Sequence, residues 1–445
     1  MPEVIADLQL HSRFSRAVSP AMTLSTIAQW ARRKGIGLVA TGDWTHPMWF
    51  REIERDLVEA GNGLLALKNN TEGDPLFLLA TEVSCIYSQG GKVRRVHTLI
   101  WVPSIASARK IGQEMTKRGC NLLSDGRPIV GLTSIQIADL VFAIEPEALI
   151  IPAHAWTPWF SVYGSLGGFN SIDEAFGSFA KNIYAVETGL SSNPAMNWRI
   201  KELDNRAIVS FSDAHSGPKL GREATVFTIV GNLSYRAVYE AIRGLGASSI
   251  AYTIEFYPEE GKYHYTGHRS CGVRQTPDET RQKGATCPVC GKPLTVGVMH
   301  RVDDLAARTD AEVGLSVIAR TPFGTDTVMY GSTVFPRRPP FVMLVPLVEI
   351  IAEALGSPAT SPKVDLPYKR LTSEVGNEFF VLLRASLPDI AKIAGERVAE
   401  GIHLVRQGKL VIDPGYDGVF GVVKIWGSDG SKIVSGDKEQ LALPV

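Results

Sequence analysis

Residues 4–12 read Val-Ile-Ala-Asp-Leu-Gln-Leu-His-Ser, a short apolar run that carries acidic and imidazole side chains toward its end. A run of this length predicts a buried β-strand, which we assign to residues 4–10. Asp7 and His11 then lie at or just past the strand end, where loops are free of the packing that fixes a strand interior. The stretch therefore predicts a first strand that delivers reactive side chains to one end of a sheet.

The same pattern repeats over the first 250 residues, where short apolar segments alternate with helical patterns. Thr23 is a candidate N-cap and Gly35 a candidate C′ residue of one such helix, and Asn193 with Pro194 predicts the start of another. The alternation indicates an α/β fold, either a strand/helix barrel or an open doubly wound sheet. We favour the barrel because it gathers strand-end residues at one face. The predicted strands span residues 4–10, 37–41, 76–83, 93–102, 148–153, 183–186, 207–211 and 225–230.

Length and composition set the class of protein. The chain has 445 residues, 44% of them hydrophobic and 21% charged, which is typical of a globular protein of two or three domains. We expect a barrel over residues 1–250, a small zinc-binding module over 251–302, and a mostly helical region over 303–445 that ends in a strand pair and a tail. Helices are predicted over residues 303–309, 340–355, 374–383 and 387–407, and strands over 409–426.

The N-terminal residues and the apolar runs bear on location. No run of about 18 apolar residues occurs, which excludes a membrane span. The first ten residues contain two acids and no basic segment, so no secretory signal is visible. We therefore expect a cytoplasmic protein, and we expect it to be monomeric.

Histidines and carboxylates fall at the predicted strand ends. Imidazole and carboxylate groups together suit Zn²⁺, Mn²⁺ or iron, and several of them at one barrel mouth hold two or three divalent ions. Such a cluster activates a water molecule and stabilises charge on a phosphoryl oxygen, which predicts phosphoester hydrolysis. Glu187 is either a ligand or a group that orients a ligating histidine. The candidate ligands are Asp7, Gln9, His11, Asp43, Glu82, His97, His154, Glu187, Asp213 and His215.

The order of these residues resembles the PHP superfamily of polymerase and histidinol phosphatase metallohydrolases. That family begins with Asp-x-His-x-His-Ser and closes with Asp-x-His, which match residues 7–12 and 213–215. The resemblance implies a distorted seven-strand barrel with metal ions at its mouth and places Asp213, His215 and His11 in the catalytic centre. Gln9 replaces the first histidine of the pair, and its neutral amide is a poor ligand for a transition metal. Gln9 is either a natural variant with fewer metals or an inactivating change.

The end of the strand predicted over residues 37–41 also departs from the PHP pattern. It reads Thr-Gly-Asp, ending at Asp43, where many relatives read Thr-Asp-His. A carboxylate can replace an imidazole as a ligand for a divalent ion. We therefore expect Asp43 to be a ligand.

Two Cys/His pairs, separated by fifteen residues, form a second metal signature. Each pair is spaced two residues apart, which places four donors on facing knuckles, as a closed tetrahedral Zn²⁺ site requires. A closed site has no open position for water, so we expect a structural role. Cys85 and Cys120 are expected to be buried apolar side chains. The candidate zinc ligands are His268, Cys271, Cys287 and Cys290, with His264 or His300 as alternatives to His268.

The formal net charge of zero averages over unlike regions. Residues 88–127 hold eight Lys/Arg against two acids, and residues 262–301 hold seven against two. Carboxylates bound to cations do not repel a DNA backbone as free carboxylates do, so neutrality does not exclude a DNA partner. The zinc module is either a nucleic-acid clamp or a charged solvated loop. Candidate DNA contacts are Arg94, Arg95, Lys262, Arg269 and Arg274, and candidate walls of a base pocket are Trp44, Trp156, Trp159 and Tyr163.

The barrel and zinc motifs together resemble the endonuclease Q family. The resemblance covers at least residues 1–305 and includes the segments 152–159, 212–216 and 220–223. It implies a metal-dependent DNA repair endonuclease that cuts on the 5′ side of uracil, hypoxanthine, xanthine or an abasic site. A stacked base is inaccessible to a barrel mouth, so the damaged nucleotide must flip into a pocket.

Two other functions stay open. A PHP-type phosphatase of a small metabolite such as histidinol phosphate has no need of a zinc module, and a DNA-binding PHP protein with weakened catalysis would account for Gln9. The last residues, Gln440–Val445, resemble the bacterial sliding-clamp-binding peptide. An ordinary frayed tail is the alternative for that segment.

Overall fold

A computed structural model describes residues 2–427 of the chain. The chain forms two compact units, each described by itself below. The first consists of Met1–Arg32, Ile36–Ser192 and Glu202–Ala251, and the second of Arg33–Gly35, Asn193–Lys201 and Tyr252–Val445. Within residues 2–427, no helix is long and apolar enough to cross a membrane. The segment Gln440–Val445 lies outside the described residues.

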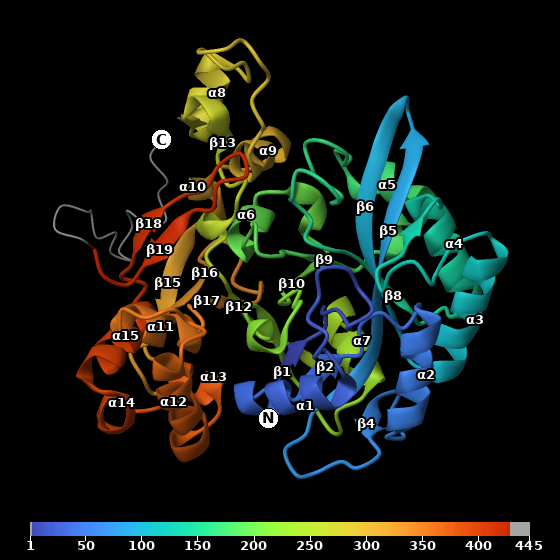
Figure 1. Ribbon diagram of the computed structural model, residues 1–445. Coiled ribbons are helices and arrows are strands. Elements are labelled where there is room, and N and C mark those ends of the chain that lie inside the picture. Colours follow the sequence, from blue (N-terminus) through green and yellow to red (C-terminus); the bar gives the residue numbers. More distant parts are fainter. Residues whose placement is uncertain (1, 428–445) are drawn as a thin grey trace. The chain divides into compact units, whose positions relative to one another are not determined.

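The first unit is built on a mixed β-sheet (Figure 1). β1 (Glu3–Asp7) runs parallel to β2 (Leu38–Ala40), and β2 runs parallel to β5 (Leu76–Gln89), as the strand/helix alternation predicts. β11 (Ala224–Thr228) is antiparallel to β1, and β6 (Lys92–Val102) is antiparallel to β5, so the sheet is not wholly parallel. The other strands of this sheet in the first unit are β3 (Leu57–Glu59), β4 (Leu65–Leu67), β7 (Ile129–Val130) and β8 (Leu149–Pro152). A separate two-stranded sheet consists of β9 (Ala185–Glu187) and β10 (Ala207–Val209), which run parallel.

β5 and β6 form a long two-stranded ribbon with a tight turn (Figure 1). Gln89 pairs with Lys92, and the two residues between them, Gly90 and Gly91, have φ angles of 61° and 72°. Two successive positive φ angles are typical of a type I′ turn, which joins antiparallel strands without a helix. In the resulting register Glu82 lies opposite Leu99, and His97 opposite Ser84. Glu82 and His97 therefore share one face of the ribbon as diagonal neighbours.

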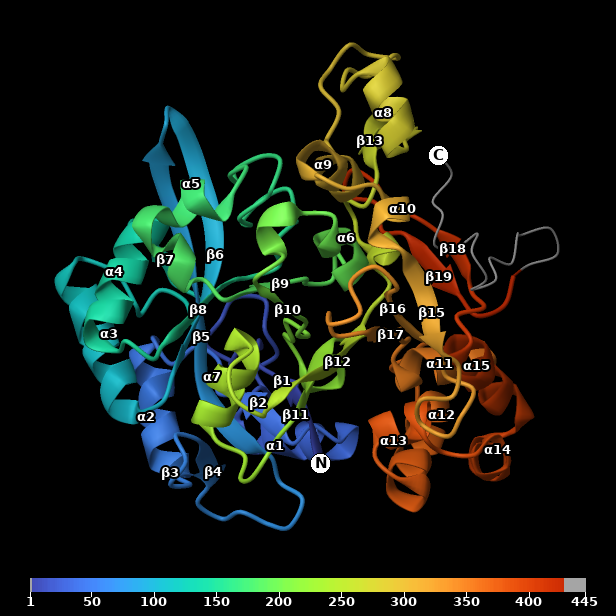
Figure 2. The ribbon, with the colours of Figure 1, turned by 180° about the vertical axis from the view of Figure 1, so that it is seen from behind.

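The helices of the first unit begin at the expected signals. The helix predicted from residue 23 is α1 (Leu24–Lys34), where the Thr26 N–H donates to Thr23 Oγ1 at 3.3 Å and Gly35 adopts a φ of 89°. α4 (Ser134–Ile144) starts at a capping box of Thr133 and Gln136. α3 (Ile105–Lys117) packs beside α4 and against β6 (Figure 2). The other helices are α2 (Pro47–Asp56), α5 (Ile172–Phe176) and α7 (Tyr235–Arg243).

The second unit contains a sheet that the sequence did not predict. β15 (Leu315–Ala319), β16 (Met329–Ser332) and β17 (Phe341–Met343) pair antiparallel in order, and β17 is parallel to β12 (Ser249–Glu255). The prediction of a mostly helical region is therefore wrong for these three strands. The helix predicted from residue 340 begins only at Leu347, because a residue that precedes proline, here before Pro346, is driven to extended backbone.

The C-terminal helices of the second unit are shorter than predicted. The expected helix over residues 387–407 is two helices, α14 (Leu387–Ala394) and α15 (Glu396–Arg406), because Gly395 adopts a φ of 89° and ends the first. The predicted terminal strand pair is confirmed, with β18 (Val411–Asp413) antiparallel to β19 (Val422–Lys424). The remaining elements are α6 (Pro194–Trp198), β13 (Thr266–His268), β14 (Val273–Gln275), α8 (Pro277–Lys283), α9 (Val298–Leu305), α10 (Asp310–Val313), α11 (Leu347–Ala354), α12 (Pro362–Arg370) and α13 (Glu378–Leu383).

Candidate metal centres

The loops that follow the strands of the first unit hold several polar residues in strained backbone conformations. Asp43, His154 and Asp213 have φ angles of 44°, 29° and 47°. Non-glycine residues with positive φ are uncommon, and they concentrate at functional sites. The loop with His154 also needs a glycine neighbour, because a Cβ at Gly189 would lie 2.3 Å from the His154 Cβ. The backbone of these loops is therefore held in a conformation that fixes the direction of the Asp43, His154 and Asp213 side chains.

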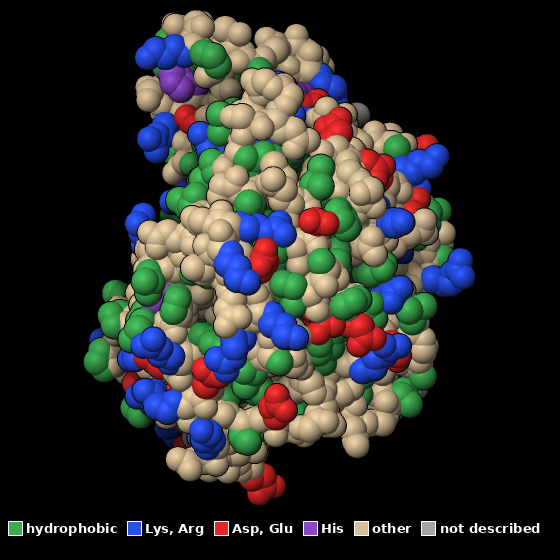
Figure 3. Space-filling view, turned by 90° about the vertical axis from the view of Figure 1, so that its right-hand side faces the viewer, with side chains coloured by type: hydrophobic (Ala, Val, Ile, Leu, Met, Phe, Trp, Pro, Cys, Tyr) green, Lys and Arg blue, Asp and Glu red, His purple; other side chains and the backbone are tan. Residues whose placement is uncertain are grey.

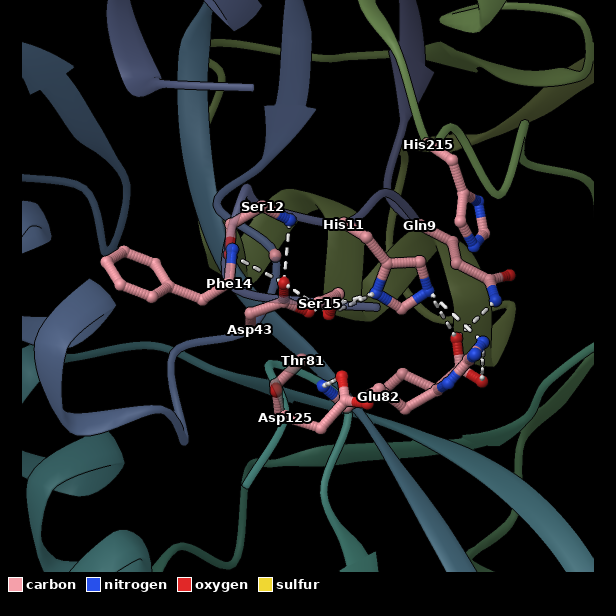
Figure 4. Close-up of polar contacts among 12 residues, drawn as sticks. Gln9, His11, Ser12, Phe14, Ser15, Asp43, Thr81, Glu82, Asp125 and His215 are labelled. Atoms are coloured by element: carbon pink, nitrogen blue, oxygen red, sulfur yellow. Dashed lines mark hydrogen bonds and ion pairs between the residues drawn. The ribbon is translucent and has the colours of Figure 1, made fainter. Parts of the chain in front are cut away.

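Six of the ten predicted ligands form two candidate metal-binding groups. One consists of His11, Asp213 and His215, and the other of Glu82, His97 and His154. Within each group the ligand atoms lie within 4.8 Å of one another. The groups adjoin, because His11 Nε2 lies 3.2 Å from both Glu82 Oε2 and Asp213 Oδ1. Figure 4 shows the His11 ring between Asp43 and Glu82.

Hydrogen bonds to the far nitrogen orient three of these imidazoles. His11 Nδ1 donates to Asp43 Oδ1 at 3.0 Å, and His215 Nδ1 donates to the Asp213 carbonyl at 2.8 Å. The Thr157 hydroxyl donates to the Trp159 carbonyl at 2.8 Å, so its oxygen accepts from His154 Nδ1 at 3.2 Å. In each ring Nε2 is left as the metal-binding atom, an arrangement common among ligating histidines.

Asp43 lies outside both candidate groups, although we expected it to be a ligand. Besides the His11 contact, its Oδ2 accepts from the backbone N–H of Ser12 at 2.6 Å, from the Ser12 hydroxyl at 2.7 Å and from the Ser15 hydroxyl at 2.8 Å (Figure 4). Both oxygens are thus engaged within the protein. The structure favours a role for Asp43 in orienting His11.

Asp7 is held in a similar way. Its oxygens accept from the Ser212 N–H at 3.0 Å, the Ser212 hydroxyl at 2.6 Å and the Gly221 N–H at 2.8 Å. Asp7 therefore ties the loop that carries Asp213 to the end of β1. Burial nevertheless raises the pKa of Asp7 to about 6, against the effect of these hydrogen bonds.

Gln9 and Glu187 each carry one buried oxygen that suits a cation. The Gln9 amide donates to Glu82 Oε2 at 2.8 Å, and the Glu187 carboxylate accepts the His154 backbone N–H at 2.7 Å. Oε1 of Gln9 and Oε1 of Glu187 are buried without a hydrogen-bond partner among the described residues. Unpaired buried oxygens are rare and call for an ion or water. The donor set and these oxygens fit divalent metal ions.

The charges in this region are strongly coupled. Burial raises the pKa of Glu187 well above its ordinary range, and the carboxylates of Asp213 and Glu82 add to the effect. Burial also disfavours ionised Glu82, but His97 and Arg127 hold its pKa well below the ordinary value. Burial lowers the pKa of His97 to about 4. A neutral His97 beside an ionised Glu82 is the state that binds a metal.

Three of the four aromatic residues predicted to wall a base pocket lie in the core instead. Trp44 and Trp156 are only 1% exposed, and Tyr163, which is fully buried, stacks on Trp156 at a centroid distance of 4.7 Å. A nucleobase cannot reach these rings without rearrangement of the core. Trp159 is half-buried on the loop that follows His154 and keeps the predicted role open.

The predicted DNA-contacting residues differ in availability. The guanidinium of Arg94 is engaged within the protein and is not free to contact DNA, because it lies 4.1 Å from the Phe169 ring centroid and donates to the Gly168 carbonyl. Arg274 is exposed but paired with Asp413 at 2.6 Å. On the face shown in Figure 3, basic and acidic side chains are interspersed rather than gathered in one patch. Arg95 is half-buried, and Lys262 and Arg269 are exposed.

Arg127 was not among the predicted site residues. It follows Gly126 in the loop before β7, and its Nη1 lies 3.6 Å from Glu82 Oε1 and 3.5 Å from His11 Nε2. Two sequence signals cover Arg127, the basic excess of residues 88–127 and the resemblance of residues 125–128 to the endonuclease Q family, but neither assigns a role to this arginine.

The four predicted zinc ligands of the second unit lie together. Their ligand atoms are within 4.8 Å of one another, and β13 and β14 pair antiparallel to support the first knuckle. In the second knuckle the Gly291 N–H donates to the Cys287 carbonyl at 2.9 Å. Burial opposes the thiolate of Cys287, but backbone N–H groups of Cys290 and Val289 lower its pKa to about 6. The group consists of His268, Cys271, Cys287 and Cys290.

The alternative zinc ligands and the remaining cysteines are placed elsewhere. His264 is buried with Nδ1 donating to the Pro258 carbonyl at 3.1 Å, and His300 lies 3.6 Å from Asp304. Neither belongs to the zinc group. Cys85 and Cys120 are buried, as predicted.

Replacement of a knuckle cysteine tests the zinc group. Cys287→Ser removes one thiolate, and structural Zn²⁺ binding contributes about 10 kcal/mol or more to folding, so we expect the variant to lose about one zinc ion per chain and to unfold at lower temperature. Elemental analysis and thermal unfolding measure both effects. Cys120→Ser serves as the control and should keep its zinc. Full zinc content in Cys287→Ser would contradict the assignment.

Comparison with solved structures identifies close similarity over almost the whole chain. The lesion-specific endonuclease PfuEndoQ of Pyrococcus furiosus is 32% identical with a TM-score of 0.79, and 95% of each chain is covered. An endonuclease Q bound to a 27-mer duplex with an abasic lesion at its active site is also 32% identical, with a TM-score of 0.80, and the match covers 96% of this chain and 97% of that one.

Curated proteins and one family model also match. YqxK of Bacillus subtilis is 27% identical over 438 residues, 95% of this chain and all of that protein. MJ0043 of Methanocaldococcus jannaschii is 29% identical over 277 residues, 61% of this chain, and the match spans only 31% of that longer protein. The model of the MJ0043 C-terminal domain matches residues 346–409, the segment of α11 to α15.

Proposed function

The chain belongs to the endonuclease Q family, and on this basis we propose that it is a metal-dependent DNA repair endonuclease. The observation that carries the proposal is the junction of the two candidate metal groups, where His11 lies 3.2 Å from both Glu82 and Asp213. Adjoining metal groups of imidazole and carboxylate suit the hydrolysis of a phosphodiester. The proposal includes a closed PHP-type barrel around these strand ends.

Each group of the site has a part in this reaction. Divalent ions held by His11, Asp213, His215, Glu82, His97 and His154 would acidify the attacking water and neutralise charge on the phosphate. Asp43 keeps the His11 ring in place through the 3.0 Å hydrogen bond to Nδ1. In hydrolysis the water oxygen bonds to phosphorus while one ester P–O bond breaks. One water proton ends on the leaving alcohol and the other on solvent.

We infer that the substrate is a damaged nucleotide in duplex DNA. The similar structures are a lesion-specific enzyme and a complex with an abasic lesion at its active site. Flipping a nucleotide out of the helix costs a few kcal/mol, and the cost is lowest for a weakly paired base. Deaminated bases such as uracil, hypoxanthine and xanthine pair weakly. Half-buried Trp159, beside the His154 loop, is the candidate to stack on the flipped base.

The zinc module has a supporting role in this proposal. A site with four protein ligands is closed, so a Zn²⁺ ion held by these residues would order the surrounding loops rather than take part in chemistry. Lys262 and Arg269 are exposed near these loops and suit contact with a DNA backbone. Arg269 also ties its own loop, because its backbone N–H donates to Asp417 Oδ2 at 2.7 Å.

The direct test is cleavage of labelled duplexes that carry one deoxyuridine, deoxyinosine or abasic site, with Mg²⁺, Mn²⁺ or Zn²⁺. We expect a nick on the 5′ side of the lesion and none in undamaged duplex. Asp213→Asn should lower the rate by at least about 100-fold, because even outer-shell metal partners are worth 10- to 100-fold. Asparagine tolerates the positive φ of this position, so the backbone is preserved.

The exposed Asp139 of α4 provides the matched control, since Asp139→Asn removes the same charge far from the ligands in sequence and should cut at the wild-type rate. Equal rates for Asp213→Asn and wild type would exclude Asp213 from the centre. Hydrolysis of histidinol phosphate without any DNA cleavage would instead establish the small-molecule phosphatase.

A substitution at Gln9 distinguishes two hypotheses, an active nuclease and a DNA-binding protein with weakened catalysis. Gln9→His should add one imidazole donor beside Glu82, so we expect the metal content to rise by one ion per chain and nicking to become faster. Elemental analysis and single-turnover assays measure these changes, with Gln113→His on α3 as the control. If only the histidine variant nicks DNA, the wild-type chain is the weakened form.

Trp159 tests the flipped-base hypothesis. Stacking of a base on an aromatic ring is worth about 1–3 kcal/mol, so Trp159→Ala should weaken binding to a deoxyuridine duplex by roughly five- to 150-fold. Binding to undamaged duplex should change much less. Phe380→Ala, which removes a half-exposed ring on α13, is the control. Unchanged affinity and cleavage in Trp159→Ala would remove the hypothesis.

A further inference from the structure

Arg127 is built into the candidate metal centre by its loop. The Asp125 carboxylate accepts the backbone N–H of Arg127 at 3.1 Å and that of Arg16 at 3.3 Å, and the Gly126 N–H donates to the Phe14 carbonyl at 3.0 Å. These bonds fasten the loop to the segment that follows His11.

Gly126 makes the close approach of this loop possible. A Cβ at this position would lie 2.3 Å from both Asp43 Oδ2 and Ser15 Oγ, which no side chain permits. The loop backbone therefore packs directly on the carboxylate that orients His11. As a result the next residue, Arg127, extends its guanidinium to the boundary of the two metal groups.

The guanidinium of Arg127 keeps hydrogen-bond donors that no other described residue accepts. Its Nη1 contacts are 3.5 and 3.6 Å long, and its other guanidinium N–H groups have no partner among the described residues. The side chain is 25% exposed, so these donors reach solvent. Arg94 differs, since a carbonyl and a ring already occupy its guanidinium.

A guanidinium at this place has a specific chemical use. It stays protonated and has no lone pair to offer, so it cannot be a metal ligand. It can donate two parallel hydrogen bonds to a phosphate, which a lysine cannot do. Gln9 has removed one imidazole from the metal pattern, and Arg127 adds a fixed positive charge next to the carboxylate that Gln9 contacts.

We propose that Arg127 is a further catalytic residue that binds the non-bridging oxygens of the phosphate at the junction of the two metal groups. This inference rests on the proposed function, because it takes the metal groups to be a phosphodiester-cleaving centre. Arg127 holds the phosphate and stabilises charge that develops on it during hydrolysis. It takes no part in proton transfer.

Titration of the metal-loaded protein with inorganic phosphate tests this role without catalysis. Excess metal is removed first, and calorimetry measures the dissociation constant. We expect Arg127→Gln to bind phosphate at least about tenfold more weakly than wild type, with unchanged metal content. Arg127→Lys should recover only part of the affinity, since it restores charge but not the two-pronged geometry. Arg236→Gln on α7, an exposed arginine paired with Glu147 and Glu240, should match wild type.

Phosphate affinity within twofold of wild type in Arg127→Gln would overturn the proposal. Loss of bound metal in that variant would overturn it as well, because Arg127 would then hold the ligands rather than the phosphate. The rate of nicking at deoxyuridine should fall together with phosphate affinity. A wild-type protein that binds phosphate through Arg127 but leaves every damaged duplex intact would refute the nuclease function and keep the phosphate site.

Discussion

The stability of the first unit depends on neutralising the negative charge of carboxylates that are buried at the ends of its strands. Asp7, Asp43, Glu82 and Glu187 are almost fully buried within one region. An isolated buried carboxylate is too costly to stay ionised, so each needs hydrogen-bond donors, imidazoles or cations. Glu82 has the most partners, with contacts to Gln9, His11, His97 and Arg127. The loops around it are arranged to supply those partners.

The predictable part of the site followed from spacing along the chain. Strands and polar residues alternate regularly, so the order of His11, Glu82, His154 and Asp213 by itself indicates one site. The zinc group was predictable for a different reason, because each of its two pairs is a short local motif. The caps of α1 and α4 are local too. Local signals are read reliably because tertiary packing changes them little.

The unpredicted part depends on which way side chains face. Trp156 and Trp159 stand three residues apart on one loop, yet one packs on Tyr163 in the core and the other is half-buried. Arg94 and Arg127 both come from a basic stretch, yet only Arg127 lies beside the metal groups. Among the strands β15 to β17, which escaped prediction, only β17 has a partner distant in sequence, because Phe341 pairs with Thr253 of β12, whereas β15 and β16 are neighbours in the chain. Such outcomes depend on tertiary contacts that no single stretch encodes.

The length of the turn at Gly90 and Gly91 determines the register of β5 and β6, and with it the position of two residues of the metal centre. Glu82 and His97 meet because the two-residue turn sets which residues of β5 and β6 stand opposite each other. One residue more or less in that turn would shift the ladder and rotate one of the two side chains to the other face. The ribbon tip therefore tolerates changes that preserve its length and positive φ angles. An insertion of an odd number of residues in the turn would separate Glu82 from His97, although Glu82 lies seven residues before Gln89 on β5.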